Sequence, residues 1–151
     1  MLGNDLYQII QRDTRLSVRF KGVYAANELP KRLPFCSIVI VNCCNRNKPG
    51  EHWIALCQES ESKLEMLDSY GHEPEMYNLK NKLPNSEIIV FNTKQLQSLA
   101  SEVYGHYCLY YCYFKSHSHS MAEIVSATFS NDTKNNDQRV YKYVKKLFNL
   151  K

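Results

Sequence analysis

The chain has 151 residues, of which 44% are hydrophobic and 23% are charged, and its formal net charge is +4. This length supports one hydrophobic core and argues against two full-sized domains, so residues 1–151 are predicted to form a single domain. The longest apolar run, around residues 37–41, is far too short to cross a bilayer.

Cysteine usage indicates the cellular setting. Most of the six cysteines lie in apolar, strand-like or helical segments, where an unpaired cysteine behaves as a small hydrophobic residue. The six are Cys36, Cys43, Cys44, Cys57, Cys108 and Cys112. The first residues also lack the pattern of a secretion signal. We therefore expect a reducing, intracellular environment.

The N-terminal segment is predicted to begin with an amphipathic helix capped by Asn4 or Asp5. Apolar residues recur at helical spacing at Leu6, Ile9, Ile10 and Leu16. Residues 20–34 contain one glycine and two prolines with little periodicity, and are predicted to be an irregular surface connection.

Three strands are predicted next. Residues 35–42 are β-branched and follow a proline, which is typical of a strand buried on both faces. After a turn at 45–50, the segments 52–58 and 64–69 are predicted to pair as a hairpin through the charged turn 59–63. That pairing brings His52 and Asp68 to the same end of adjacent strands.

The C-terminal half alternates helical and polar segments. We expect a short helix or loop at 74–84 and a fourth strand at 88–91, followed by a polar loop and a helix at 104–114. A turn at 116–120, a helix at 121–129 and a polar loop at 130–136 come next. The last predicted element is a helix at 139–150, whose inward side carries Val140, Tyr141, Val144, Leu147 and Phe148. Together these elements predict an α+β fold with a central, mostly antiparallel or mixed sheet flanked by helices.

The segment 94–114 is the organising element of this prediction. A polar loop leads through Gly105 into a helix that is apolar nearly all round, so the helix should be buried. Its N-terminus then presents unpaired amides and the positive end of the helix dipole, which suits an oxyanion or a thiolate. The alternative is an ordinary core helix with a glycine in its first turn.

A histidine, a carboxylate and a helix N-terminus are the parts of a triad-type acyl-transfer site. The stretches GEHWIALCQ, LDSYG and QSLASEVYGHYC resemble the adenain family of viral cysteine proteases, more closely those of Polinton (Maverick) elements and adintoviruses, and distantly the ubiquitin-like-protein-specific proteases. The resemblance covers residues 20–148 and implies a papain-like, adenain-like cysteine protease fold.

The resemblance implies roles for individual residues. His52 matches the general base, Asp68 the carboxylate that orients it, and Gln97 the side chain of the oxyanion hole. Trp53 matches the aromatic residue that follows the histidine. Tyr104 stands where the family has its nucleophilic cysteine.

That departure weakens the expected activity. A tyrosine hydroxyl has an ordinary pKa of about 10 and lies farther from the backbone than a cysteine sulfur. We therefore expect a disabled endopeptidase; the alternative is a non-catalytic pseudoprotease that binds an extended peptide. Cys108, which with Gly105 also matches the family, is an unfavourable substitute nucleophile because it lies about 6 Å further along the helix.

The same helix and the turn that follows it also carry residues that are able to bind metal. Cys108, Cys112, His117 and His119 form a C-x3-C-x4-H-x-H pattern, which matches no standard zinc finger, so no metal is expected. The resemblance implies a peptide or viral precursor protein as substrate, cleavage after small residues such as glycine, and a monomer in the host nucleus or the virion. The resemblance also implies that DNA or a short viral peptide activates the protein. The mildly basic charge is compatible with weak DNA binding.

Overall fold

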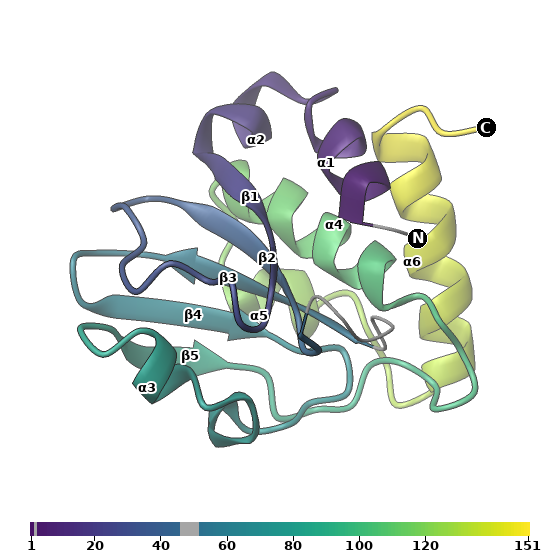
Figure 1. The fold of residues 1–151 in the computed structure, drawn as a ribbon. Coiled ribbons are helices and arrows are strands. Elements are labelled where there is room, and N and C mark those ends of the chain that lie inside the picture. The colour runs from purple at the N-terminus through teal and green to yellow at the C-terminus, as the bar shows by residue number, and fades with distance from the viewer. Residues whose placement is uncertain (2, 46–51) are drawn as a thin grey trace.

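The computed structural model describes residues 1, 3–45 and 52–151. Within those ranges, five strands form one mixed sheet in the spatial order β1-β2-β3-β4-β5. The strands are β1 (Phe20–Ala25), β2 (Ile38–Asn42), β3 (Trp53–Gln58), β4 (Lys63–Leu67) and β5 (Glu87–Phe91). The helices are α1 (Gly3–Ile10), α2 (Thr14–Arg19), the 3-10 helix η1 (Pro74–Tyr77), α3 (Leu79–Lys82), α4 (Tyr104–Ser116), α5 (Met121–Val125) and α6 (Thr133–Leu147). The predicted α+β fold with a mixed sheet flanked by helices is confirmed (Figure 1).

The centre of the sheet is antiparallel and its edges are parallel. β2, β3 and β4 pair antiparallel, whereas β1 runs parallel to β2 and β5 runs parallel to β4. The predicted hairpin is confirmed, with Ala55 opposite Leu67. The predicted strand 35–42 begins later, at Ile38, because Phe35 is exposed and Cys36 has a positive φ of 59°.

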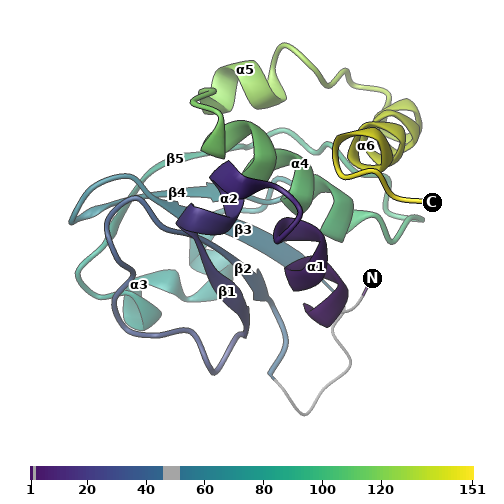
Figure 2. The same ribbon diagram turned by 90° about the horizontal axis from the view of Figure 1, so that it is seen from above.

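Two apolar clusters lie on opposite faces of the sheet. One joins the sheet to α1, α2, α4, α5 and α6, and the other lies between the sheet and the segment that contains η1 and α3. Figure 2 shows the same division, with α3 on the side of the sheet opposite α4. The alternation of side chains along β2 divides Ile38 and Ile40 from Val39 and Val41, so the strand is buried on both faces, as predicted.

The predicted buried helix is α4. Tyr107 to Cys112 are all buried, and α4 packs against β3 and α6. Gly105 is buried too, since a side-chain carbon there would meet Leu6 at 3.4 Å. The N-terminus of α4 is therefore fixed against α1.

The connection predicted for 20–34 is partly wrong, because its first six residues form β1. Two features of β1 explain why the sequence pattern does not predict it. The pairing with β2 shifts register between Phe20 and Gly22, where Gly22 has φ 150°, and most of β1 is only half buried at the edge of the sheet. Neither the alternation nor the apolar run of a typical strand is present.

The first helix also differs from the prediction. Asn4 and Asp5 lie inside α1 and not before its first residue, and Leu16 belongs to a second helix. Asp13 caps that second helix by accepting a hydrogen bond from the Leu16 amide at 2.7 Å. The chain thus turns between α1 and α2 where continuous periodicity predicted one helix.

The C-terminal elements shift by a few residues. α4 extends to Ser116, the helix predicted at 121–129 ends at Val125, and α6 begins at Thr133 within the predicted loop 130–136. Asp132 caps α6 by accepting from the Asn135 amide at 3.0 Å. Tyr141 is 44% exposed, so its predicted inward position is wrong.

The segment 74–84 contains η1 and α3, as expected for a short helix. The turn predicted at 45–50 lies, apart from Asn45, outside the described residues, as does Gly50 of the GEHW motif. In the part of the chain that is described, no helix combines the length and the apolarity that spanning a membrane demands.

Candidate active site

His52 and Asp68 meet at one end of the β3–β4 hairpin. β3 begins directly after His52, and β4 ends directly before Asp68. His52 Nε2 lies 2.7 Å from Asp68 Oδ1, and the side chains of His52 and Asp68 are 11% and 0% exposed. The predicted proximity of these two side chains is confirmed.

The proton positions on His52 follow from this contact. An ionised carboxylate only accepts hydrogen bonds, so Nε2 must carry a hydrogen and donate it to Asp68. In the neutral ring the lone pair then lies on Nδ1. That atom is buried and has no hydrogen-bond partner among the described residues. His52 therefore holds a sheltered basic nitrogen in the tautomer that a general base requires.

Asp68 is ionised and firmly held. Oδ1 also accepts from the Tyr70 amide at 2.9 Å, and Oδ2 accepts from the Tyr77 hydroxyl at 2.5 Å and the His72 amide at 3.2 Å. Burial works to raise the pKa of Asp68, but the hydrogen bonds from His52, Tyr77 and Tyr70 hold it below its ordinary value. The carboxylate therefore stays charged at neutral pH and can stabilise an imidazolium.

His72 and Tyr77 were not identified from the sequence. His72 Nδ1 lies 3.0 Å from Asp68 Oδ2 and 3.1 Å from the Tyr77 hydroxyl. The only local signal is the D-S-Y-G turn, in which an aspartate accepts from the amide two residues later. The turn places His72 beside the Asp68 carboxylate, and Tyr77, the last residue of η1, contacts the same carboxylate.

Two tyrosine rings pack against His52. Tyr70 stacks on its face, with ring centroids 4.6 Å apart and an interplanar angle of 26°. Tyr104, the first residue of α4, approaches edge-on at 5.8 Å and 80°. The residue at position 104 therefore lies at the helix N-terminus and beside the histidine ring.

Gln97 is fully buried beside the turn that follows Asp68. Its Oε1 accepts from the Ser69 hydroxyl at 2.7 Å, and its Nε2 donates to the Ser101 carbonyl at 2.8 Å. The Gln97 amide also donates to the Ser69 carbonyl at 3.0 Å. These bonds join the loop that precedes α4 to the turn that holds the carboxylate, and the role of Gln97 as an oxyanion donor stays a prediction.

Gly71 is required where these two segments cross. It has φ 74°, and a side-chain carbon there would lie 2.8 Å from the Thr93 carbonyl oxygen. Any other residue would be strained and would push the 93–94 backbone away. The glycine of the D-S-Y-G motif thus sets the distance between the turn and the loop.

α6 fixes the same loop from the other side. Asn136 donates to the Leu96 carbonyl at 3.1 Å, and Asp137 accepts from the Ser98 amide at 3.2 Å and from the Tyr107 hydroxyl at 2.9 Å. Asn136 is fully buried and Asp137 is 9% exposed. Polar residues at the start of α6 therefore hold the loop that carries Gln97.

Cys108 does not face the site. It is 1% exposed, and burial raises the pKa of its thiol well above the ordinary value. Cys112, on the same helix, is fully buried with its pKa raised by the same cause. These thiols stay protonated at neutral pH, and their burial closes them to a peptide.

The side chains of the C-x3-C-x4-H-x-H pattern do not come together in the structure. Cys108 and Cys112 belong to the apolar core, and His117 Nε2 lies 3.8 Å from Asp13. Over the ranges described, no group of three or more histidine, cysteine, aspartate or glutamate side chains is positioned to hold a metal ion.

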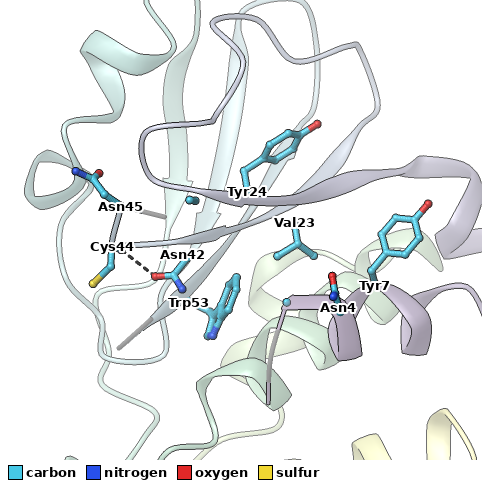
Figure 3. A pocket seen from close by; sticks show the side chains of 10 residues that line it. Asn4, Tyr7, Val23, Tyr24, Asn42, Cys44, Asn45 and Trp53 are labelled. Atoms are coloured by element: carbon cyan, nitrogen blue, oxygen red, sulfur yellow. Dashed lines mark hydrogen bonds between the residues drawn. The ribbon is translucent and has the colours of Figure 1, made fainter. Parts of the chain in front are cut away.

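A pocket of about 410 Å³ adjoins this end of the sheet. Figure 3 shows the Trp53 ring in the pocket, with Asn42 on one side and Val23 and Asn4 on the other. The Asn42 side chain accepts from the Cys44 amide at 2.9 Å. Since Trp53 directly follows His52, the pocket and the histidine lie at the same end of β3.

Comparison with known proteins gives matches among solved structures but none among family models or curated sequences. No protein-family model and no curated protein sequence matches the chain. Among solved structures, the chain is similar to the crystal structure of the selenomethionine form of the ASFV pS273R protease, with 20% identity and a TM-score of 0.45. The match covers 74% of this chain and 44% of that protease, so the chain spans less than half of the length of that protein.

Proposed function

We propose that this chain is an adenain-like cysteine protease domain in which Tyr104 occupies the nucleophile position, so that the chain as it stands does not hydrolyse peptides through a thiol. The observation that carries the proposal is the state of His52. Asp68 holds the hydrogen on Nε2, and the unpartnered Nδ1 belongs to a ring that Tyr104 contacts at the start of α4.

A thiol at position 104 would complete a known reaction type. His52 Nδ1 would take the thiol proton, and the sulfur would attack the peptide carbonyl carbon. The C–N bond would then break as the imidazolium gives its proton to the leaving amine, and water would release the acid from the thioester by the same base. Asp68 would stabilise the imidazolium in both halves of the cycle.

Tyr104 cannot take this role. Its phenol has an ordinary pKa of about 10, and the ring moves the oxygen several ångströms beyond where a cysteine sulfur would lie. The burial of Cys108 argues against rescue from within the helix. The chain therefore retains the proposed base, His52 with Asp68, but has no nucleophilic thiol at position 104.

Restoring the thiol tests this proposal. We expect Tyr104→Cys to cleave members of a panel of Gly-Gly and Gly-Ala peptides, and both the parent chain and Tyr104→Cys/His52→Ala to be inactive. Tyr104→Ser is the matched control, because it has a small side chain at the same position without a thiol. Cleavage by the parent chain, or cleavage by Tyr104→Cys that survives His52→Ala, would contradict the assignment.

The second candidate function is peptide binding without cleavage. It is supported by the rings of Tyr70 and Tyr104 against His52 and by the pocket beside Trp53, next to the edge strand β1. An extended peptide could add to an exposed strand edge and use the pocket for a side chain. Calorimetric titration of the parent chain with the same peptides tests it, and Trp53→Ala should abolish the binding.

The biological setting is part of the proposal and rests on the resemblance alone. It comprises cleavage of a viral or transposon-encoded precursor during virion maturation, in the host nucleus or the virion, with DNA or a short peptide as activator. Steep salt dependence of DNA affinity would support the DNA part, and absence of binding at low salt would remove it.

A further inference from the structure

The Asp68 carboxylate is shared by two histidines and a tyrosine. Oδ1 accepts from His52 Nε2 at 2.7 Å and from the Tyr70 amide at 2.9 Å. Oδ2 accepts from the Tyr77 hydroxyl at 2.5 Å and also contacts the amide and Nδ1 of His72 at 3.2 and 3.0 Å. One oxygen thus serves the proposed base, and the other is held by His72 from the following turn and by Tyr77 from η1.

The proton on His72 is fixed by its neighbours. The Tyr77 hydroxyl gives its only hydrogen to Asp68, so its oxygen can offer His72 only a lone pair. His72 Nδ1 lies 3.1 Å from that oxygen and 3.0 Å from Asp68 Oδ2, and neither oxygen has a hydrogen to give it. Nδ1 must therefore carry a hydrogen that it shares between both acceptors.

These contacts restrict rotation of the carboxylate. Three donors converge on Oδ2, and the His72 ring and the Tyr77 hydroxyl are the two that belong to side chains. Together with the Tyr70 amide on Oδ1 they hold the plane of the carboxylate so that Oδ1 is directed at His52. The His52 side chain is 11% exposed and that of His72 is 40% exposed. The arrangement thus has an inner histidine beside position 104 and an outer one that reaches solvent.

We propose that His72 and Tyr77 are positioning residues, which act through Asp68 to keep His52 in the Nε2–H tautomer with its Nδ1 lone pair available at position 104. The catalytic consequence rests on the proposed function, but the effect on the tautomer does not. Without these two side-chain donors, only His52 and the backbone amides of Tyr70 and His72 hold the carboxylate, so it can rotate and weaken the contact that selects one tautomer of His52.

Nitrogen-15 NMR of the histidine rings tests this in the chain as it exists. In the neutral ring of His52 the parent should give one protonated nitrogen, Nε2, and one unprotonated nitrogen, Nδ1. We expect His72→Phe and Tyr77→Phe to shift the two resonances toward each other, as a mixture of tautomers does. His72→Asn retains a donor near the position of Nδ1 and should give the parental spectrum. Tyr143→Phe is the control: it removes a hydroxyl from α6, outside the site, and should leave the His52 resonances unchanged.

Kinetics of the Tyr104→Cys variant provide the second readout. Because a hydrogen bond to a charged group is lost, adding His72→Phe or Tyr77→Phe should lower kcat about tenfold. KM should change less than about twofold, since neither residue is expected to bind substrate. His72→Asn should recover most of the lost rate. A purely structural role would give no such rescue.

The two proposals fail in different ways. Unchanged His52 resonances in both His72→Phe and Tyr77→Phe would overturn the positioning role, whatever the activity of Tyr104→Cys. Shifted resonances together with an inactive Tyr104→Cys would support the positioning role and reject the proposed function. The phenyl ring of Tyr77→Phe preserves packing, so this variant tests the hydroxyl alone.

Discussion

Asp68→Asn is the substitution that the site should tolerate least. The new side chain has almost the same shape, but it carries no charge and its amide nitrogen presents hydrogens where the carboxylate accepted them. Whichever way it turns, that nitrogen faces donors: His52 and the Tyr70 amide on one side, or Tyr77 and His72 on the other.

The size of the loss follows from these contacts. A buried donor left without an acceptor costs about 1–3 kcal/mol, and breaking a buried charged pair costs about 3–5 kcal/mol. The Asp68 amide and carbonyl remain bonded to the Asn92 side chain, which keeps the turn in place. We therefore expect Asp68→Asn to lower the free energy of unfolding by about 2–4 kcal/mol, or the melting temperature by about 4–16 °C.

Trp53 makes the measurement direct. It is the single tryptophan of the chain, it is 7% exposed, and it adjoins His52, so its fluorescence reports unfolding in urea. Glu123→Gln is the control: Glu123 is exposed, it forms a capping box with Ser120 at the start of α5, and glutamine can take its place there, so the urea midpoint should hardly change. Since the pKa of Asp68 is lowered in the folded state, its stabilisation is present above the ordinary pKa and is lost as the pH falls through the folded pKa. A loss below about 1 kcal/mol at pH 7 would refute the reasoning.

Two further predictions concern polar side chains outside the site, partly buried His106 and fully buried Tyr111. Burial, with a smaller contribution from the terminal amine, lowers the pKa of His106 to about 4, so its stabilisation is present above pH 6.5 and is lost as the pH falls to about 4. After allowance for partial exposure the loss should be about 1–2 kcal/mol, and urea unfolding at pH 7.5 and 4.5 should show a smaller difference for His106→Phe than for the parent. Tyr111→Phe removes a hydrogen bond of 2.6 Å to buried Glu65 and should cost about 1–2 kcal/mol, while unchanged stability in urea would show that Lys115, 3.1 Å from the same oxygen, suffices for Glu65.

The sequence predicts the centre of this fold because its signals there are local. The β-branched run of β2, the hairpin of β3 and β4 and the apolar α4 each agree with their burial. The edge strand β1 has a register shift at Gly22 and a half-exposed surface, and its parallel partner begins more than ten residues later, so no local pattern indicates it.

The site divides in the same way. The proximity of His52 and Asp68 follows from hairpin pairing, which is a local rule. His72 reaches Asp68 through the turn that follows it, and its ring is placed between Asp68 and Tyr77. Tyr77 reaches Asp68 from η1, so its contact depends on how η1 packs against the sheet. Likewise, the polar start of α6 resembles a loop in the sequence. Asn136 in this stretch is nevertheless fully buried, and its hydrogen bond to the Leu96 carbonyl is what makes that burial tolerable.

The central claim is that position 104 lies within reach of the His52 base, and alkylation of the thiol introduced by Tyr104→Cys tests it without a substrate. Iodoacetamide modification at pH 6 would be followed by mass spectrometry of the peptide that contains position 104. A neighbouring imidazolium stabilises a thiolate, so we predict modification about tenfold or more faster in Tyr104→Cys than in Tyr104→Cys/His52→Ala. Equal rates in the two variants would contradict the assignment of position 104 to the nucleophile.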